Sequence, residues 1–148
     1  MNFNSNLSME FALKTAVAYS AVCKPLCQEL KIPQTAFDIL LFLANNEGYD
    51  TARDICRCRG MKPGIVSFHV EKLVNEGFLE RQSVPGDRRK TRLVCTEKAA
   101  PVLERGRARQ ELFGRNMAEG LGEEDLAHLR KCMAVFERNI EQIRTGKA

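Results

Sequence analysis

The segment from residue 51 to residue 96 constrains the fold most, because short periodic runs alternate there with strong turn signals. Thr51 is a favourable N-cap and Asp54 follows three residues later, a pairing that indicates a helix start. This helix should end at Gly60, where a left-handed turn costs little. Lys62 and Pro63 should open the next helix, with Pro63 in the first-turn position that proline tolerates. The pattern predicts two short helices joined by a tight turn.

The second of these helices has one apolar face. Val66, Val70 and Leu73 recur at helical spacing, so they should pack inward. At about 100° per residue, the opposite face is then set by geometry. The residues expected on the outward face or at its margin are Gly64, Ser67, Phe68, Glu71, Lys72 and Asn75. His69 lies beside the stripe and is expected to be a packed, neutral, structural histidine.

A β-hairpin should follow these helices. Residues 78–84 and 91–96 are rich in strand formers and flank the turn signal Pro85-Gly86-Asp87. Two short helices followed by a hairpin form a winged helix-turn-helix, in which the second helix enters the DNA major groove. The fold class predicted is therefore mainly α with a small β-hairpin wing.

Charge is concentrated in the same segment. Residues 53–92 hold ten Lys/Arg and five Asp/Glu, a net charge of +5, whereas the whole chain carries +4. A basic excess confined to one block is typical of a surface for a polyanion, and also of an ordinary solvated surface.

We predict DNA-binding residues on both parts of this motif. They are Lys62, Pro63, Gly64, Ser67, Phe68 and Lys72 on the second helix, and Arg88, Arg89 and Arg92 on the wing. An exposed Phe68 fits contact with a thymine methyl group, and equally fits plain surface exposure or burial under the wing. The wing arginines could follow phosphates or enter the minor groove. Asp87 is expected to orient the Arg89 guanidinium through a bidentate pair.

Helices are expected to flank the motif on both sides. Residues 7–29 form one, which Pro25 should kink or end early, and a second runs from Pro33 to residue 45. Thr96 should cap a long helix, which Pro101, Gly106 and Gly114 are expected to weaken. A last helix should follow Gly122, with a regular apolar seam suited to helix pairing. The predicted division is an N-terminal dimerisation helix (1–32), a DNA-binding domain (33–96) and C-terminal dimerisation helices (97–148).

Several classes of protein are disfavoured. No apolar run is long enough for a membrane helix and no secretory signal pattern opens the sequence, so a cytoplasmic location is expected. The six cysteines include no CxxC pair, so neither a metal site nor a cofactor is predicted. No nucleophile–base pair, phosphate loop or paired catalytic carboxylates emerge, so the chain is not expected to be an enzyme.

The motif residues resemble one regulator family in pattern and spacing. The run TARDICRCRGMKPGIVSFHVEKLVNEGFLERQSVPGDRRKTRLVCTEKA resembles the MarR family of bacterial regulators, and Asp87-Arg88-Arg89 followed by Leu93 and Thr96 is similar to its wing signature. The tail LGEEDLAHLRKCMAVFERNIEQI is similar to its final helix. This resemblance implies a homodimer on pseudo-palindromic promoter DNA, acting as a repressor, with binding modulated by a small, often phenolic, molecule.

The resemblance also implies an effector pocket between the dimer helices and the winged domain. The residues placed there are Tyr19, Cys23, Leu26, Phe37 and Phe113. The sequence departs from the family pattern at Arg59, where an aliphatic residue is usual. It departs again at Lys62, which replaces a Ser/Thr cap, at Phe68, and at residues 99–101 after the wing.

Two alternatives to ligand control of a DNA-binding regulator stay open. Cys58 lies between Arg57 and Arg59, the electropositive context of a redox-sensing thiol. A winged-helix protein-interaction module without DNA binding is the other alternative. Steep weakening of DNA binding with salt would distinguish the regulator from the module.

Overall fold

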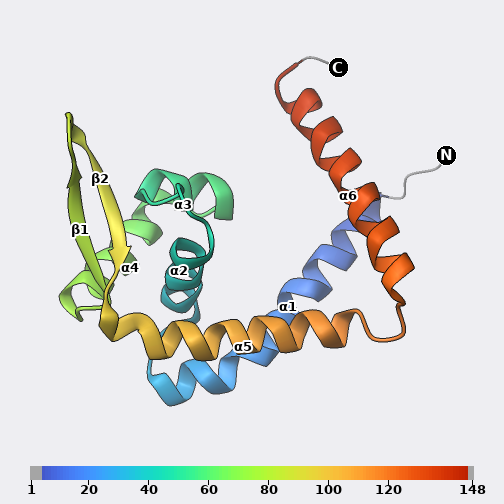
Figure 1. Ribbon diagram of the computed structural model, residues 1–148, viewed down its shortest axis with the longest axis horizontal. Coiled ribbons are helices and arrows are strands. Elements are labelled where there is room, and N and C mark those ends of the chain that lie inside the picture. Colours follow the sequence, from blue (N-terminus) through green and yellow to red (C-terminus); the bar gives the residue numbers. More distant parts are fainter. Residues whose placement is uncertain (1–4, 147–148) are drawn as a thin grey trace. The chain divides into compact units, whose positions relative to one another are not determined.

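A computed structural model describes residues 5–146 of the chain (Figure 1). Residues 1–4, which include part of the segment examined for a secretory signal, and residues 147–148 lie outside the described residues. The elements in chain order are α1 (Ser5–Leu30), α2 (Gln34–Asn45), α3 (Ala52–Arg59), α4 (Pro63–Asn75), β1 (Leu79–Val84), β2 (Asp87–Cys95), η1 (Glu97–Ala99), α5 (Ala100–Met117) and α6 (Glu123–Arg144). The predicted fold class, mainly α with a β-hairpin, is confirmed.

The described residues form two compact units, which divide between Glu111 and Leu112. The predicted functional division at residues 32 and 96 is a separate matter and stays a prediction. Within residues 5–146, no helix is long and apolar enough to cross a membrane.

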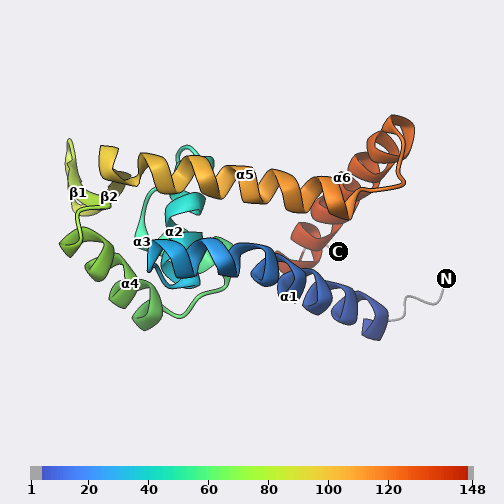
Figure 2. The ribbon, with the colours of Figure 1, turned by 90° about the horizontal axis from the view of Figure 1, so that it is seen from below.

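The core of the first unit is built around α2. Phe37, Ile39 and Leu40 of this helix are completely buried. In Figure 2, α2 lies between α1 and the first part of α5. Gly106 of α5 lies so close to α2 that an added Cβ would be 2.9 Å from Leu41 Cδ2 and 3.1 Å from Phe37 Cε2. The sequence suggested only that Gly106 weakens its helix, but its small size permits the α5–α2 approach.

Helix α1 continues through Pro25 to Leu30, so of the two predicted outcomes, a kink or an early end, the early end is wrong. Its carboxyl end closes with Lys31 in the left-handed region, at φ 54°. Pro33 then precedes the first turn of α2, close to its predicted place.

The two helices of the motif begin and end as predicted. Thr51 and Asp54 form a capping box, in which Asp54 N donates to Thr51 Oγ1 at 3.2 Å and Thr51 N donates to Asp54 Oδ2 at 3.1 Å. Gly60 ends α3 in the left-handed region at φ 62°. Pro63 is the first residue of α4, and Lys62 before it makes no side-chain cap hydrogen bond.

The hairpin is longer than the sequence predicted. Strand β1 pairs antiparallel with β2 from Leu79 opposite Cys95 to Ser83 opposite Thr91, and Val84 is opposite Asp87 across the Pro85-Gly86 turn. The second strand therefore begins at Asp87 and not at Thr91, because the two residues Pro85 and Gly86 alone make the turn. Residues 88–90 are extra on β2 and bulge near the tip.

Thr96 does not cap a helix with its side chain, contrary to the prediction. Its Oγ1 donates instead to the carbonyl of Gly77 at 2.5 Å, which joins the two ends of the hairpin. The turn η1 intervenes before α5 begins.

Helix α6 belongs to the second unit and begins after Gly122, as predicted. It buries none of its residues within this chain. Its apolar residues with about half or more of their surface exposed are Leu129, Met133, Phe136, Ile140 and Ile143.

Candidate nucleic-acid interface

Helix α4 buries the stripe predicted for it. Val66 is completely buried, and Val70 and Leu73 are 3% and 1% exposed. They join a core that includes the fully buried Ile55 of α3. Since this face is fixed by packing, the opposite face is held outward, and all six residues predicted there are exposed (Gly64, Ser67, Phe68, Glu71, Lys72 and Asn75).

The amino end of α4 is open. Lys62, Pro63 and Gly64 are all exposed. A Cβ added to Gly64 would meet nothing within 4 Å, so the chain's own packing does not require a glycine there. The small residue leaves the backbone accessible to a molecule outside the chain.

Phe68 is 64% exposed, so it is not buried under the wing. Its ring contacts that of His69 edge to face, with centroids 5.1 Å apart. His69 is partly buried, and its Nδ1 has no hydrogen-bond partner among the described residues. Burial, aided by the charge of Lys72, lowers the pKa of His69, which fits the neutral packed histidine expected from sequence.

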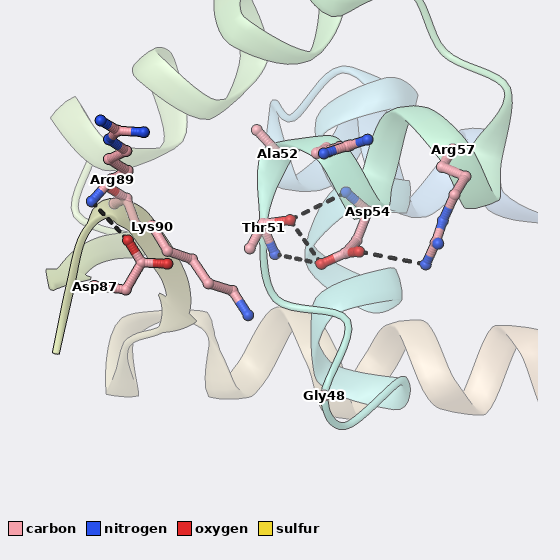
Figure 3. A pocket seen from close by; sticks show the side chains of 10 residues that line it. Gly48, Thr51, Ala52, Asp54, Arg57, Asp87, Arg89 and Lys90 are labelled. Carbon is pink, nitrogen blue, oxygen red and sulfur yellow. Dashed lines mark hydrogen bonds and ion pairs between the residues drawn. The ribbon is translucent and has the colours of Figure 1, made fainter. Parts of the chain in front are cut away.

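Asp87 shapes the tip of the wing through the backbone. Its Oδ1 accepts from Arg89 N at 3.0 Å, and Figure 3 shows this contact beside the outward Arg89 side chain. Among the described residues no ion pair joins the two side chains, so the predicted guanidinium pairing is not observed. Asp87 instead supports the bulge that carries Arg88, Arg89 and Lys90.

Two ion pairs connect the wing to the rest of the motif. Arg92 Nε donates to Asp50 Oδ2 at 2.5 Å, and the neighbouring Leu93 N donates to the Asp50 carbonyl at 2.7 Å. Arg81 of β1 pairs with Glu71 of α4 at 2.7 Å. Arg92 is therefore engaged within the chain, whereas Arg88 and Arg89 form no ion pair with any described residue.

The residues predicted for an effector pocket lie mostly in a filled core. Cys23, Leu26 and Phe37 are at most 1% exposed, which leaves no open surface beside them. Tyr19 is half-buried, donates to Asp38 Oδ1 and accepts from Gln110, each at 3.3 Å. Phe113 belongs to the second unit and is half-buried.

Sequence reasoning missed the carboxylate of Asp38, whose only signal was one acidic residue inside the apolar run of α2. Burial raises the pKa of Asp38, and the Arg59 guanidinium at 3.9 Å opposes that shift. Arg59, which departs from the family pattern, is thus an exposed partner for a half-buried acid. The first motif helix packs through Ile55 instead.

The cysteines differ in exposure. All six are free thiols, and Cys58 alone among them is exposed. Burial raises the pKa of the Cys27 thiol to about 11 and also raises that of Cys23, so both thiols stay protonated at neutral pH. The arginines beside Cys58 contact carboxylates, Arg57 at 3.5 Å from Asp54 and Arg59 at 3.9 Å from Asp38. No group of three potential metal ligands occurs among residues 5–146.

Helix α3, the turn at Gly60, helix α4 and the β1–β2 hairpin form a winged helix-turn-helix, a class of DNA-binding domain. The model of the MarR family matches residues 30–90, which hold α2, α3, α4 and β1. These residues therefore match the MarR family, in agreement with the resemblance found in the sequence.

Solved structures share the fold over nearly the whole chain. The transcriptional regulator PA3341 has a TM-score of 0.80 at 20% identity, over 92% of this chain and 98% of that one. The regulator Tm0710 from Thermotoga maritima has a TM-score of 0.60 at 28% identity, over 92% and 95%. The organohalide-sensing regulator RdhR, solved with 2,4-dichlorophenol bound, has a TM-score of 0.68 at 17% identity, over 97% and 84%. The family match supports a DNA-binding regulator and not an enzyme.

Proposed function

We propose that this protein is a sequence-specific transcriptional repressor that binds pseudo-palindromic promoter DNA as a homodimer in the cytoplasm. The observation that carries the proposal is the outward surface of α4 beside the wing. It combines an accessible amino end at Gly64, exposed Ser67, Phe68 and Lys72, and wing cations that form no ion pair with the described residues.

Helix α4 is proposed as the reading helix. Ser67 can bond to base edges and Lys72 to bases or phosphates, while Lys62, Pro63 and Gly64 bring the backbone close to the DNA. The 64% exposed ring of Phe68 is proposed to contact a thymine methyl group. This contact would favour a thymine at the contacted position of each half-site.

The wing is proposed to grip the DNA through Arg88 and Arg89. Both are exposed and lie on a bulge that the Asp87 carboxylate supports. Such side chains can follow phosphates or enter a narrow minor groove. Arg92 is half-exposed and bound to Asp50, so we assign it chiefly to holding the wing in place.

The proposed homodimer is supported by exposed apolar residues on α6 and on the amino-terminal part of α1. The exposed apolar residues of α6 recur every three or four positions, from Leu129 to Ile143. Helix α1 exposes its own apolar set, Met9, Phe11, Leu13 and Val17. Apolar faces of this extent favour association with a second copy.

Control by a small aromatic molecule is also proposed. RdhR binds 2,4-dichlorophenol and shares the fold. Tyr19, Cys23, Leu26, Phe37 and Phe113 remain the proposed contacts. Because three of these are core residues, a ligand would have to separate the helices that they join, and this could alter the spacing of the reading helices.

The test is in vitro selection from random duplexes, followed by footprinting and fluorescence anisotropy. We expect two related half-sites about one helical turn apart and a binding constant that falls steeply with salt. Arg89→Ala should weaken binding with little change in melting temperature, and Arg138→Ala on α6 is the charge-matched control. Failure to enrich any duplex, or binding insensitive to salt, would overturn the proposal. Reporter expression from a promoter that carries the selected site should rise when the gene for this protein is deleted, and this rise would establish repression.

A further inference from the structure

An open cleft of about 760 Å³ separates the tip of the wing from the start of α3 (Figure 3). Its walls come from two parts of the motif that are far apart in sequence. Arg53 and Arg57 belong to α3, and Arg89 and Lys90 to the bulge of β2. Arginine and lysine are the usual ligands of phosphate groups in proteins.

The two carboxylates in this cleft are already engaged. Asp54 accepts from the backbone and hydroxyl of Thr51 at 3.1 and 2.6 Å and lies 3.5 Å from Arg57. These hydrogen bonds, first that of the Thr51 side chain, lower the pKa of Asp54, and the charges of Arg57 and Lys90 contribute to the same shift. Asp87 accepts from Arg89 N. Neither carboxylate forms an ion pair with Arg53, Arg89 or Lys90.

Those three cations have no ion-pair partner anywhere among the described residues. All three are exposed, and Figure 3 shows the Lys90 side chain extending from the wing toward the start of α3. Unpaired like charges on facing walls repel one another, and an anion placed between them would relieve that repulsion.

We propose that this cleft holds a backbone phosphate of DNA, bound by Arg53 and Lys90 together with Arg89. The inference rests on the proposed function and adds Arg53 and Lys90, which the sequence did not mark for DNA contact. In helix-turn-helix proteins the first helix crosses the sugar–phosphate backbone while the second enters the groove. The cleft lies between that first helix and the wing.

The experiment combines protein variants with neutralised phosphates. The duplex selected by the parent protein is synthesised with one methylphosphonate at each position in turn, and each duplex is titrated with the parent, Arg53→Ala, Lys90→Ala and the double variant. Arg115→Ala, which removes an exposed charge from α5, is the matched control. Melting temperatures confirm that the variants fold.

We expect one or two adjacent phosphates per half-site whose neutralisation weakens the parent but not the double variant. The double variant should bind specific and non-specific DNA more weakly by the same factor. Its salt slope should fall by about 0.9 for each phosphate that the protein no longer neutralises, or roughly 2 for a dimer. Arg115→Ala should retain the parent's slope.

The cleft assignment would be overturned if, at every phosphate, the loss of affinity on neutralisation simply added to the loss caused by the double variant. An unchanged salt slope in folded variants would overturn it as well. Either result would leave the proposed function intact. A parent protein that binds no duplex would overturn the proposed function. In that case the anion site is tested by thermal unfolding with inorganic phosphate. At equal ionic strength, phosphate should raise the melting temperature of the parent more than that of the double variant. Equal shifts would reject an anion site.

Discussion

Replacing Gly106 with alanine tests how α5 is fixed against the winged domain. The new Cβ would be 2.9 and 3.0 Å from the two Cδ atoms of Leu41 and 3.1 Å from Phe37 Cε2. Leu41 is 1% exposed and Phe37 is fully buried, so neither has free space into which to move. Overpacking of this kind costs about 1–3 kcal/mol, while alanine gains about 1 kcal/mol of helix propensity over glycine.

The matched control is Gly114→Ala in the same helix. A Cβ at Gly114 meets nothing within 4 Å, so only the propensity gain of about 1 kcal/mol applies. That gain cancels between the two variants, which leaves a difference of about 1–3 kcal/mol. For a chain of this size the melting temperatures should differ by roughly 2–12 °C, with Gly106→Ala lower.

Thermal unfolding at one protein concentration measures this difference. Leu41→Val removes both Cδ atoms that meet the new methyl group, so the double variant Gly106→Ala/Leu41→Val should be more stable than the sum of the single changes predicts. If Gly106→Ala melts at or above the temperature of Gly114→Ala, the close contact of α5 with α2 is not as we describe.

Three further predictions concern the wing, a histidine and a cysteine. Asp50→Asn and Arg92→Ala should each lower the free energy of unfolding by about 0.5–1 kcal/mol, seen as a slightly lower melting temperature. Both variants should also weaken DNA binding in anisotropy titrations, because both release the wing. Opposite effects of the two variants on affinity would show that Arg92 binds DNA instead of holding the wing. Because the pKa of His69 is lowered from its ordinary 6.5, the unfolded chain binds more protons near that pH, so stability should be lost as pH falls through 6.5 toward the folded pKa. His69→Leu should abolish this loss and His128→Gln should not, by urea unfolding from pH 5 to 8. Cys58 should be alkylated first by iodoacetamide, and peroxide should change operator affinity only if it is a sensor; an equal response in Cys58→Ser would reject that role.

Local signals explain why the motif could be predicted from sequence. The capping box at Thr51, the left-handed Gly60 and the first-turn Pro63 each act within a few residues, and side-chain chemistry at that range depends little on the rest of the fold. The inward stripe of α4 was equally predictable, because helical geometry fixes which residues share a face. The outward exposure of Phe68 was predicted from the same helical geometry.

Long-range contacts account for the errors. Thr96 is of a residue type that often caps helices, yet its hydroxyl donates to the carbonyl of Gly77, 19 residues earlier. The charged run 87–90 suggested a loop, although the two-residue turn at Pro85-Gly86 let it join β2. Gly106 suggested a weak helix, because the contacts that require a glycine there are with side chains of α2, which is distant in the sequence. No local pattern reports a partner of this kind.

Sequence patterns also do not show which charged residues of the candidate nucleic-acid interface pair with one another. The net charge of residues 53–92 indicated a polyanion-binding surface but could not show which cations are available to bind one. In the folded chain Arg57, Arg81 and Arg92 pair with Asp54, Glu71 and Asp50. The first pair lies within α3, and the other two connect the wing strands to the rest of the motif. Acids in and beside the segment therefore hold the framework in place, and the cations left without an ion pair among the described residues include those of the α3–wing cleft and the wing tip. A substitution that neutralises one of these acids should accordingly change affinity mainly through the position of the wing, whereas one that removes an unpaired cation should change the salt slope at constant melting temperature.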